Sequence, residues 1–149
     1  ILKGYDDGDR SIPDYVIDKA RRVFDRHIAS IKMYYKAGGR IAMGTDAGTP
    51  HNRHGENARE LEYMCEIGIS PRDSLFFATA SAADLMRLAD QGRIREGNSA
   101  DLVLCDGDAL ADIKRAARKE NHRLVVKRGV VARDNRAAFG ARADRVAAE

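Results

Sequence analysis

The sequence contains no tryptophan, few other aromatic residues and no run of five or more basic residues, although its net charge is +3. Aromatic side chains make up only 6% of the 149 residues, which leaves no surface on which nucleic-acid bases would stack. The 26 basic and 23 acidic residues are interspersed along the chain rather than grouped. These absences argue against a nucleic-acid partner.

Cysteine is also scarce. Cys65 and Cys105 lie in different expected elements and lack the spacing of a metal-binding pair, which predicts two reduced, buried thiols in a cytoplasmic protein. No apolar stretch is long enough to span a membrane and no signal peptide is recognisable, so we expect no membrane partner. The chain begins at Ile1 without a methionine, which fits a trimmed, incomplete or processed chain.

Hydrophobic spacing predicts a long helix in the first part of the chain. Residues 1–12 are polar and contain glycines, which predicts a loop. Pro13 then opens an amphipathic helix, because apolar residues recur at steps of three and four from there up to Gly38 and Gly39. The glycine pair ends this helix, since glycine adopts the left-handed conformation at little cost.

Further helices are expected downstream. One covers residues 56–67, and Ser70 then supplies an N-cap, with Pro71 in the first turn, for a helix that runs to Ala78. Another helix is expected over residues 82–88. Its inward-facing side chains are expected to be Leu85, Met86 and Leu88.

The most informative stretch follows the long helix. Residues 40–45 form a short apolar run closed by glycine and polar residues, which predicts a buried parallel strand whose carboxyl end opens into a loop. Asp46 stands at that end, where α/β folds place their chemistry, and His51 and His54 follow closely. Carboxylate and imidazole together bind a metal or move a proton. The alternative is that Asp46 only forms a turn or caps a helix and that both histidines are merely solvated.

The character of the sequence changes near Asp90. Short apolar runs separated by glycines predict a strand over residues 101–106 and two strands over residues 123–132, joined by a tight turn at Arg128 and Gly129. The alternating helix and strand order upstream predicts an α/β unit, and this later part predicts a separate β-rich layer. From residue 134 the Ala/Arg-rich chain is expected to be weakly helical or frayed.

Several short motifs occur in a fixed order between residues 13 and 132. They are Gly44-Thr45-Asp46-Ala47-Gly48-Thr49-Pro50, His54-Gly55, Glu60-Leu61, Gly68-Ile69-Ser70-Pro71, Ala78-Thr79, Gly92-Arg93-Ile94, Ala100-Asp101-Leu102-Val103-Leu104 and Asp106-Gly107-Asp108-Ala109-Leu110. Their order and spacing resemble the C-terminal portion of a metal-dependent amidohydrolase. The resemblance is closest to the imidazolonepropionase-like and prolidase-like (Xaa-Pro or Xaa-Arg dipeptidase) branch.

The resemblance implies a fold class and a division of the chain. The fold would be α/β, with the chain supplying the last strand and flanking helices of a (β/α)₈ TIM-type barrel plus the C-terminal part of a small β-sandwich. Residues 1–89 would belong to the barrel, residues 90–134 to the sandwich and residues 135–149 to a tail. Residues 40–45 would be the eighth barrel strand.

The resemblance also implies a chemistry for the intact enzyme. Asp46 matches the family's aspartate that ligates a divalent metal, with zinc as the expected ion, and that accepts a proton from the attacking water. The reaction would hydrolyse a carbon–nitrogen bond in a small-molecule amide or dipeptide substrate. His51 and His54 lie on the loop after the strand and are carried over only as substrate-side residues.

The chain departs from the family's pattern in its metal ligands. It lacks the family's His-x-His, its bridging lysine or glutamate and its later-strand histidines, since the histidines present are His27, His51, His54 and His122. A full barrel takes about 250 residues, and a catalytic zinc uses about three protein ligands. We therefore expect the N-terminal remainder of the barrel as a partner, within a longer chain or as a separate subunit. We also expect the isolated chain to self-associate through uncovered strand edges and helix faces.

Two other interpretations stay open. In the first, the chain is a catalytically inactive barrel fragment that acts only as an association module, without bound metal. In the second, Asp46, His51 and His54 form an independent metal-binding loop. The missing ligands favour the association module for the isolated chain, whereas the order of the motifs favours a hydrolase for the parent gene.

Overall fold

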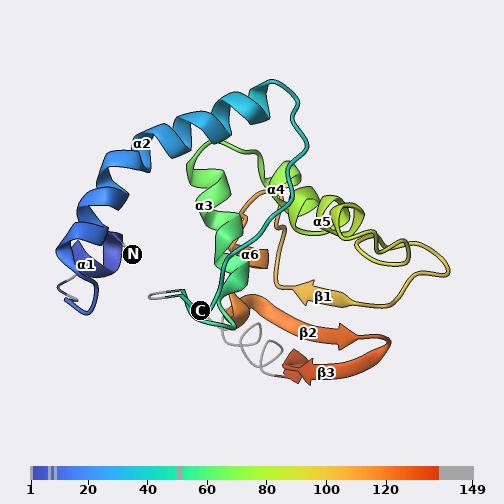
Figure 1. Ribbon diagram of the computed structural model, residues 1–149. Coiled ribbons are helices and arrows are strands. Elements are labelled where there is room, and N and C mark those ends of the chain that lie inside the picture. Colours follow the sequence, from blue (N-terminus) through green and yellow to red (C-terminus); the bar gives the residue numbers. More distant parts are fainter. Residues whose placement is uncertain (1, 7, 9, 50–51, 138–149) are drawn as a thin grey trace.

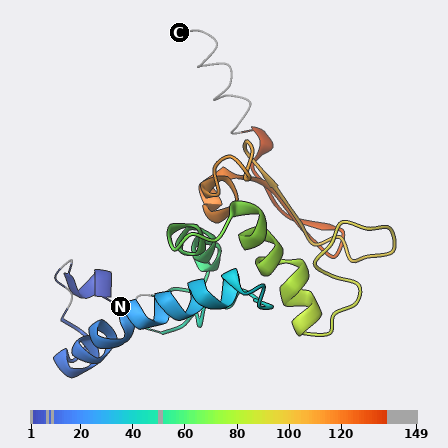
Figure 2. The ribbon, with the colours of Figure 1, turned by 90° about the horizontal axis from the view of Figure 1, so that it is seen from above.

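The computed structural model describes residues 2–6, 8, 10–49 and 52–137, and it combines helices with one small antiparallel sheet (Figure 1). The helical elements are α1 (Leu2–Asp6), α2 (Asp14–Lys36), the 3-10 turn η1 (Asn57–Arg59), α3 (Glu60–Glu66), α4 (Pro71–Ala78), α5 (Ala80–Leu85), α6 (Lys114–Ala117) and the 3-10 turn η2 (Lys119–Asn121). The strands are β1 (Leu102–Cys105), β2 (His122–Lys127) and β3 (Val130–Asp134). Helices α3 and α4 lie between α2 and the sheet (Figures 1 and 2).

The expected long helix is confirmed as α2, but its apolar stripe is only partly covered. Near its start Ile17 is buried, and near its end Ile31 and Tyr35 pack against the core. Between these points Val23 and Phe24 are 51% and 49% exposed. Towards its N-terminus the helix extends away from α3 and α4 (Figure 2). The middle of the stripe is therefore half open to solvent.

The N-terminal segment differs from the loop expected for residues 1–12, because α1 forms there. The Tyr5 hydroxyl donates a hydrogen bond to the Asp14 carboxylate at 2.6 Å. The guanidinium groups of Arg10 and Arg21 lie 4.1 and 5.6 Å from the centroid of the Tyr5 ring, within the range of cation–π attraction. These contacts hold α1 on the start of α2, and local periodicity gives no sign of them.

The core lies around α3 and α4 and consists of two apolar clusters. One cluster joins α3 to α6, and the other joins α3 to α4. Their buried members are Leu61, Ile113 and Ala117 in the first, and Met64, Ile69 and Phe77 in the second. Met43, from the segment that follows α2, packs against both clusters. The segment that follows α2 therefore packs on the core of the molecule.

The strand expected over residues 40–45 is not formed, so this prediction is wrong for the described chain. Two hydrogen bonds tie the segment to helices instead: the Met43 N–H donates to the Phe77 carbonyl at 2.9 Å, and the Ser81 hydroxyl donates to the Ile41 carbonyl. A parallel strand exists only beside a neighbouring strand. None of the three described strands pairs with this segment. The segment therefore packs on the core without a strand partner among the described residues.

The helix starts and ends were predicted better than the strand. The helix expected over residues 56–67 is present as η1 followed by α3. The Ser70 hydroxyl accepts a hydrogen bond from the Asp73 N–H at 3.1 Å, and Pro71 occupies the first turn of α4, which confirms the predicted N-cap.

Helix α5 is shorter than expected and ends at Leu85. The inward orientation expected for Leu85, Met86 and Leu88 is wrong, because these side chains are 68%, 68% and 39% exposed. Arg87 adopts a φ of +57°, so the chain leaves the helical path just after α5. The residues beyond that point no longer follow the helix face that buries Ala83.

The β-rich part is confirmed as an antiparallel sheet with the strand order β1-β2-β3. Arg128 and Gly129 form its predicted hairpin turn, with φ values of +49° and +78°. Leu102, Val103 and Leu104 alternate between the two faces of β1 and are 39%, 51% and 50% exposed. Both faces of the sheet are therefore open to solvent along β1.

The cysteines are free, as expected, but Cys65 and Cys105 are partly buried rather than fully buried. Burial raises the pKa of the Cys105 thiol. Among the described residues, no helix combines the length and the apolar character that a membrane crossing requires.

Candidate active site

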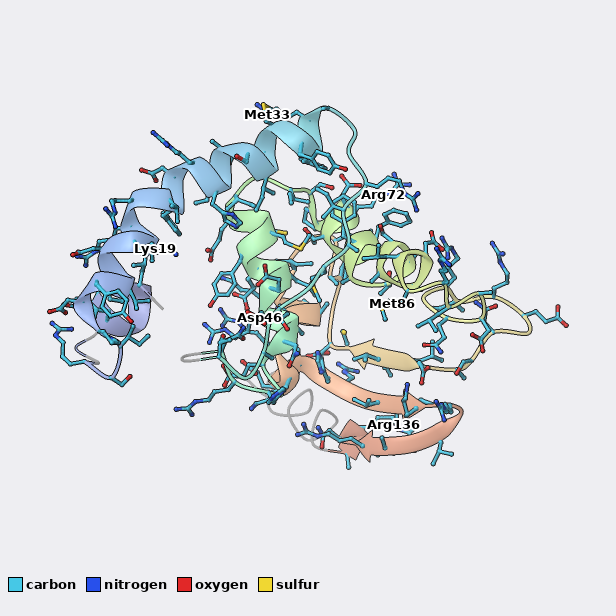
Figure 3. All side chains as sticks on the ribbon, viewed as in Figure 1. Lys19, Met33, Asp46, Arg72, Met86 and Arg136 are labelled. Atoms are coloured by element: carbon cyan, nitrogen blue, oxygen red, sulfur yellow. The ribbon has the colours of Figure 1, made fainter. Side chains whose placement is uncertain are left out.

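Asp46 lies in the loop that leads from the segment after α2 to η1 (residues 44–57, the Asp46 loop; Figure 3). Asp46 adopts a φ of +49°, a left-handed conformation that aspartate tolerates better than most residues. The Thr49 hydroxyl donates to the Asp46 main-chain oxygen at 3.1 Å, and Ala47 and Thr49 form an isolated β-bridge. The main chain on the C-terminal side of Asp46 is therefore held in a tight turn.

The Asp46 carboxylate is exposed, and no hydrogen-bond or ion-pair partner holds it within the described residues. Other aspartates of the chain are paired with basic side chains. They are Asp6 with Arg21, Asp84 with Arg93, Asp101 with Lys127, Asp106 with Arg123, Asp112 with Arg115, and Asp134 with Arg136. The Asp46 oxygens thus keep their full capacity to accept a proton or bind a ligand.

His54 lies on the same loop, and its imidazole ring covers Gly48. A Cβ atom at Gly48 would lie 3.0 Å from Nε2 of His54, and Gly48 has a φ of +103°. Glycine is therefore needed both for the turn and for the close approach of the ring. The structure brings His54 to the turn that begins at Asp46, whereas His51 lies outside the described residues.

Two asparagines that the sequence analysis did not single out organise this loop. The Asn52 side-chain amide donates to the Thr45 carbonyl, and the Asn57 amide donates to the Thr45 hydroxyl at 3.1 Å. Asparagine close to glycine signals turn chemistry in general. The sequence does not show which carbonyl or hydroxyl each amide reaches.

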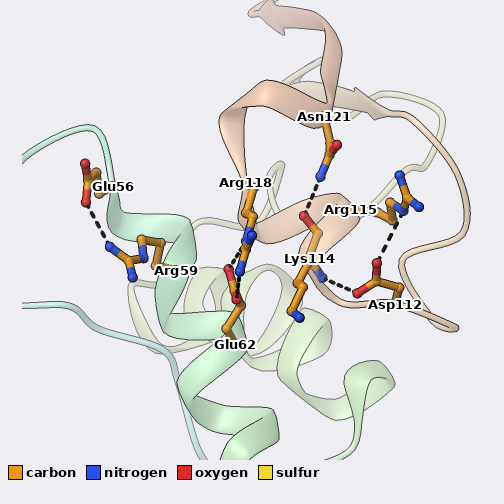
Figure 4. A network of polar contacts seen from close by, with 8 residues as sticks. All are labelled: Glu56, Arg59, Glu62, Asp112, Lys114, Arg115, Arg118 and Asn121. Atoms are coloured by element: carbon orange, nitrogen blue, oxygen red, sulfur yellow. Dashed lines mark hydrogen bonds and ion pairs between the residues drawn. The ribbon is translucent and has the colours of Figure 1, made fainter.

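Two ion pairs lie near the end of the Asp46 loop, a local one and one that joins α3 to the segment between α6 and η2 (Figure 4). Arg118 forms two hydrogen bonds of 2.9 Å with the Glu62 carboxylate, and Arg59 pairs with Glu56 at 3.3 Å. Hydrogen bonding to Arg118 holds the pKa of the Glu62 carboxyl below its ordinary value. At the start of α3, burial raises the pKa of the Glu60 carboxyl, against a smaller opposing effect of His27. Charge pairing thus joins α3 to Arg118, between α6 and η2, while Glu56 of the loop is paired locally with η1.

The described residues do not complete a metal centre. No group of three histidine, cysteine, aspartate or glutamate side chains close enough to hold a metal ion occurs among them. A catalytic zinc uses about three protein ligands and a structural zinc about four. Asp46 is a suitable oxygen donor for a divalent cation, but further ligands would have to come from elsewhere.

Comparison with known proteins gives the same family over most of the chain. The sequence pattern of the Amidohydrolase family matches residues 9–132. Ochratoxinase from Aspergillus niger is 33% identical over 101 residues, which is 64% of this chain and 20% of the relative. Imidazolonepropionase from Pyrobaculum arsenaticum is 35% identical over 91 residues, which is 60% of this chain and 22% of the relative.

Solved structures agree. A Xaa-Pro dipeptidase with bound methionine in its active site is 33% identical, with a TM-score of 0.74 over 87% of this chain and 31% of that protein. The A. niger ochratoxinase structure has a TM-score of 0.67 and 29% identity over 76% of this chain and 26% of that protein. The chain thus spans about a fifth of the curated relatives and under a third of these structures. It belongs to the amidohydrolase family, in the prolidase-like and imidazolonepropionase-like branch.

Proposed function

We propose that this chain is part of a metal-dependent hydrolase that cleaves amide or peptide carbon–nitrogen bonds, and that Asp46 accepts the proton of the attacking water. The observation that carries the proposal is the contrast at Asp46, where the main chain is held in a hydrogen-bonded turn while the carboxylate is exposed and has no partner among the described residues. A fixed position with an open carboxylate suits a proton acceptor or a ligand.

The proposal includes a divalent metal, with zinc as the expected ion. Such a metal, when bound, makes water acidic enough to attack near neutral pH. Asp46 would contribute one ligand, and the remaining ligands would come from outside the described residues, because those residues hold no group of three metal-binding side chains. No step through the metal follows from the described residues alone.

The family implies a TIM-barrel fold, and we propose that residues 1–89 belong to the C-terminal part of the barrel. Residues 40–45 would pair as the last strand once the N-terminal remainder of the barrel lies beside them. Residues 90–134 would be part of a small β-sandwich, with residues 135–149 as a tail. The open stripe of α2 and the two exposed faces of β1 support this division, since each presents apolar side chains that lack cover.

The proposed substrate is a small-molecule amide or dipeptide. One support is the likeness to a Xaa-Pro dipeptidase and to an imidazolonepropionase. The second is the position of His54, which borders the turn that begins at Asp46; we assign His54, together with His51, to the substrate side. The protein is proposed to be cytoplasmic, with no nucleic-acid or membrane partner, and to self-associate when the barrel remainder is absent.

The test starts from the longest natural product that contains this chain, whose length mass spectrometry establishes. Its hydrolysis of Xaa-Pro dipeptides and N-acyl amino acids is compared for the wild type, D46N and D18N. Asp18 lies on the open helix α2, so D18N controls for the loss of one negative charge. We expect D46N to reduce kcat by at least about 100-fold and D18N to leave it unchanged. Equal kcat values for D46N and D18N would refute the proposal.

The second candidate function is an association module without bound metal. The lack of a group of three metal-binding side chains among the described residues favours it for the isolated chain. Elemental analysis separates the two candidates. Stoichiometric zinc in the longest natural product that is lost in D46N supports the hydrolase, whereas a metal-free, inactive product of full length supports the module.

A further inference from the structure

Two asparagines of the Asp46 loop hold Thr45, the residue directly before Asp46. Asn52 Nδ2 donates to the main-chain oxygen of Thr45, and Asn57 Nδ2 donates to the Thr45 hydroxyl at 3.1 Å. One amide thus fixes the backbone of Thr45 and the other fixes its side chain. We propose that Asn52 and Asn57 are positioning residues that set the direction of the Asp46 carboxylate. This inference rests on the proposed function of Asp46.

Each asparagine also binds a glycine of the same loop. The Asn52 main-chain oxygen accepts from the Gly48 N–H at 2.8 Å, and its N–H donates to Thr49 at 3.0 Å. The Asn57 side-chain oxygen accepts from the Gly55 N–H at 3.1 Å. The side-chain amide of Asn57 makes both of its contacts at once because it carries a donor and an acceptor. Asn52 instead uses its side-chain amide for Thr45 and its main chain for Gly48 and Thr49. Together the two residues close the loop on both sides of Asp46.

The loop needs such support because Asp46 does not anchor itself. Its carboxylate has no partner among the described residues, so the main chain sets the direction of the Cα–Cβ bond and with it the region that the carboxylate can reach. That main chain has a φ of +49°, which a residue with a Cβ atom keeps only when surrounding contacts impose it. The hydrogen bonds that hold Thr45 before Asp46, and the bond from Thr49 to the Asp46 main-chain oxygen, impose this conformation.

The test uses the full 149-residue chain with N52A, N57A and the matched control N121A. Asn121 donates from its side-chain amide to the carbonyl of Lys114, seven residues earlier, as Asn52 does to Thr45, but its bond joins the end of η2 to the start of α6 (Figure 4). The first measurement, hydrogen exchange of backbone amides by NMR, requires neither metal nor substrate. It is read together with the main-chain chemical shifts of Asp46.

We expect N57A to abolish exchange protection at the Gly55 amide, and N52A to weaken it at the Gly48 amide. Both should move the Asp46 Cα shift towards its unfolded value, whereas N121A and the amides of α4 should stay unchanged. N52D adds a sharper comparison, because it keeps the size of the side chain but turns an oxygen towards the Thr45 carbonyl. N52D should shift the Asp46 resonances at least as much as N52A does. If N52A folds poorly, N52D alone provides the test of the bond to Thr45.

Turnover by the longest natural product is the second measurement. Misplacement of a reacting group by about 1 Å lowers rates by up to about 100-fold, so we expect kcat to fall about 10- to 100-fold in N52A and N57A, with KM changed less than about twofold. Unchanged Asp46 shifts in both variants, or a disturbed loop with normal kcat, would overturn the inference. Failure of the proposed function looks different, since D46N then retains turnover while the loop of the wild type stays ordered. That result removes the catalytic role of Asp46 and of both asparagines.

Discussion

Replacing Tyr35 by phenylalanine tests the contact that joins the long helix to the core. The Tyr35 hydroxyl donates to the Asp73 carboxylate at 2.5 Å, and the ring meets Phe77 edge to face, with 6.1 Å between centroids. Asp73 lies in the first turn of α4 and also accepts from the Ser70 hydroxyl at 2.7 Å. Tyr35→Phe removes the bond to Asp73 and keeps the ring, so it isolates one hydrogen bond.

The magnitude follows from the charge and exposure of that bond. Hydrogen bonds to a charged partner contribute about 1.5–3 kcal/mol to stability, and neutral ones about 0.5–1.5 kcal/mol. Asp73 is partly exposed and keeps its bond to Ser70. We therefore expect Tyr35→Phe to lower the free energy of unfolding by about 1–2 kcal/mol, measured by denaturant titration at pH 7 with the slope unchanged.

The same bond predicts a pH dependence. Hydrogen bonding to Tyr35, and then to Ser70, holds the pKa of the Asp73 carboxyl below its ordinary value. A lowered folded-state pKa contributes stability that is fully present above the unfolded-state pKa, about 3.9, and is lost as the pH falls through the folded-state pKa. The stability difference between wild type and Tyr35→Phe should therefore narrow below about pH 4.

Tyr34→Phe is the control, because Tyr34 is 53% exposed on the same helix and no hydroxyl hydrogen bond holds it within the described residues. Its free energy of unfolding should match the wild type within about 0.5 kcal/mol. If the two variants lose equal stability, or if the loss for Tyr35→Phe is the same at pH 3 and pH 7, the role assigned to the Asp73 bond is wrong.

Three further substitutions test the packing. Phe77→Ala should cost about 3–5 kcal/mol in a denaturant titration, since the ring is 7% exposed at the centre of a cluster; a loss under 1 kcal/mol would contradict the assigned core. Gly92→Ala should lower the free energy of unfolding by about 1–3 kcal/mol more than Gly97→Ala. Both glycines have positive φ, but a Cβ atom at Gly92 would lie 2.7 Å from a carbonyl oxygen, whereas one at Gly97 would meet nothing within 4 Å. Thermal unfolding of the two variants measures the difference. Arg118→Ala should cost under about 1 kcal/mol and lose that effect at high salt, since its pair with Glu62 is partly exposed.

Local chemistry was readable from the sequence. Ser70 caps α4, Gly38 follows the end of α2 with a φ of +74°, and Arg128 with Gly129 makes the hairpin turn. Each of these features depends on residues within a few positions of one another. The hydrogen bond from Asn57 to Thr45 was not readable, because Thr45 lies twelve positions away and the path of the loop brings it to Asn57.

Prediction failed where an apolar pattern lacks a pairing strand or a covering element among the described residues. Residues 40–45 have the composition of a buried strand, and Phe24 sits on the apolar stripe of α2, yet the first forms no strand and the second is 49% exposed. Apolar periodicity indicates which side chains of a segment are expected to be buried, but it does not name the element that buries them. If the proposed barrel is correct, its N-terminal remainder would supply both the strand partner of residues 40–45 and the cover of the α2 stripe.

The isolated chain can form the turn at Asp46, but it does not supply strand partners for residues 40–45 within the described residues. The turn at Asp46 depends on hydrogen bonds within residues 45–57, which the chain supplies itself. The proposed pairing of residues 40–45 would depend on strands outside the described residues, since β1, β2 and β3 pair only with one another. If the proposed barrel is correct, addition of its N-terminal remainder should bring strand hydrogen bonds to residues 40–45 and cover Phe24, while the Asp46 turn stays as it is. The candidate proton acceptor would thus be shaped before the barrel closes, and closure would supply its ligands rather than its geometry.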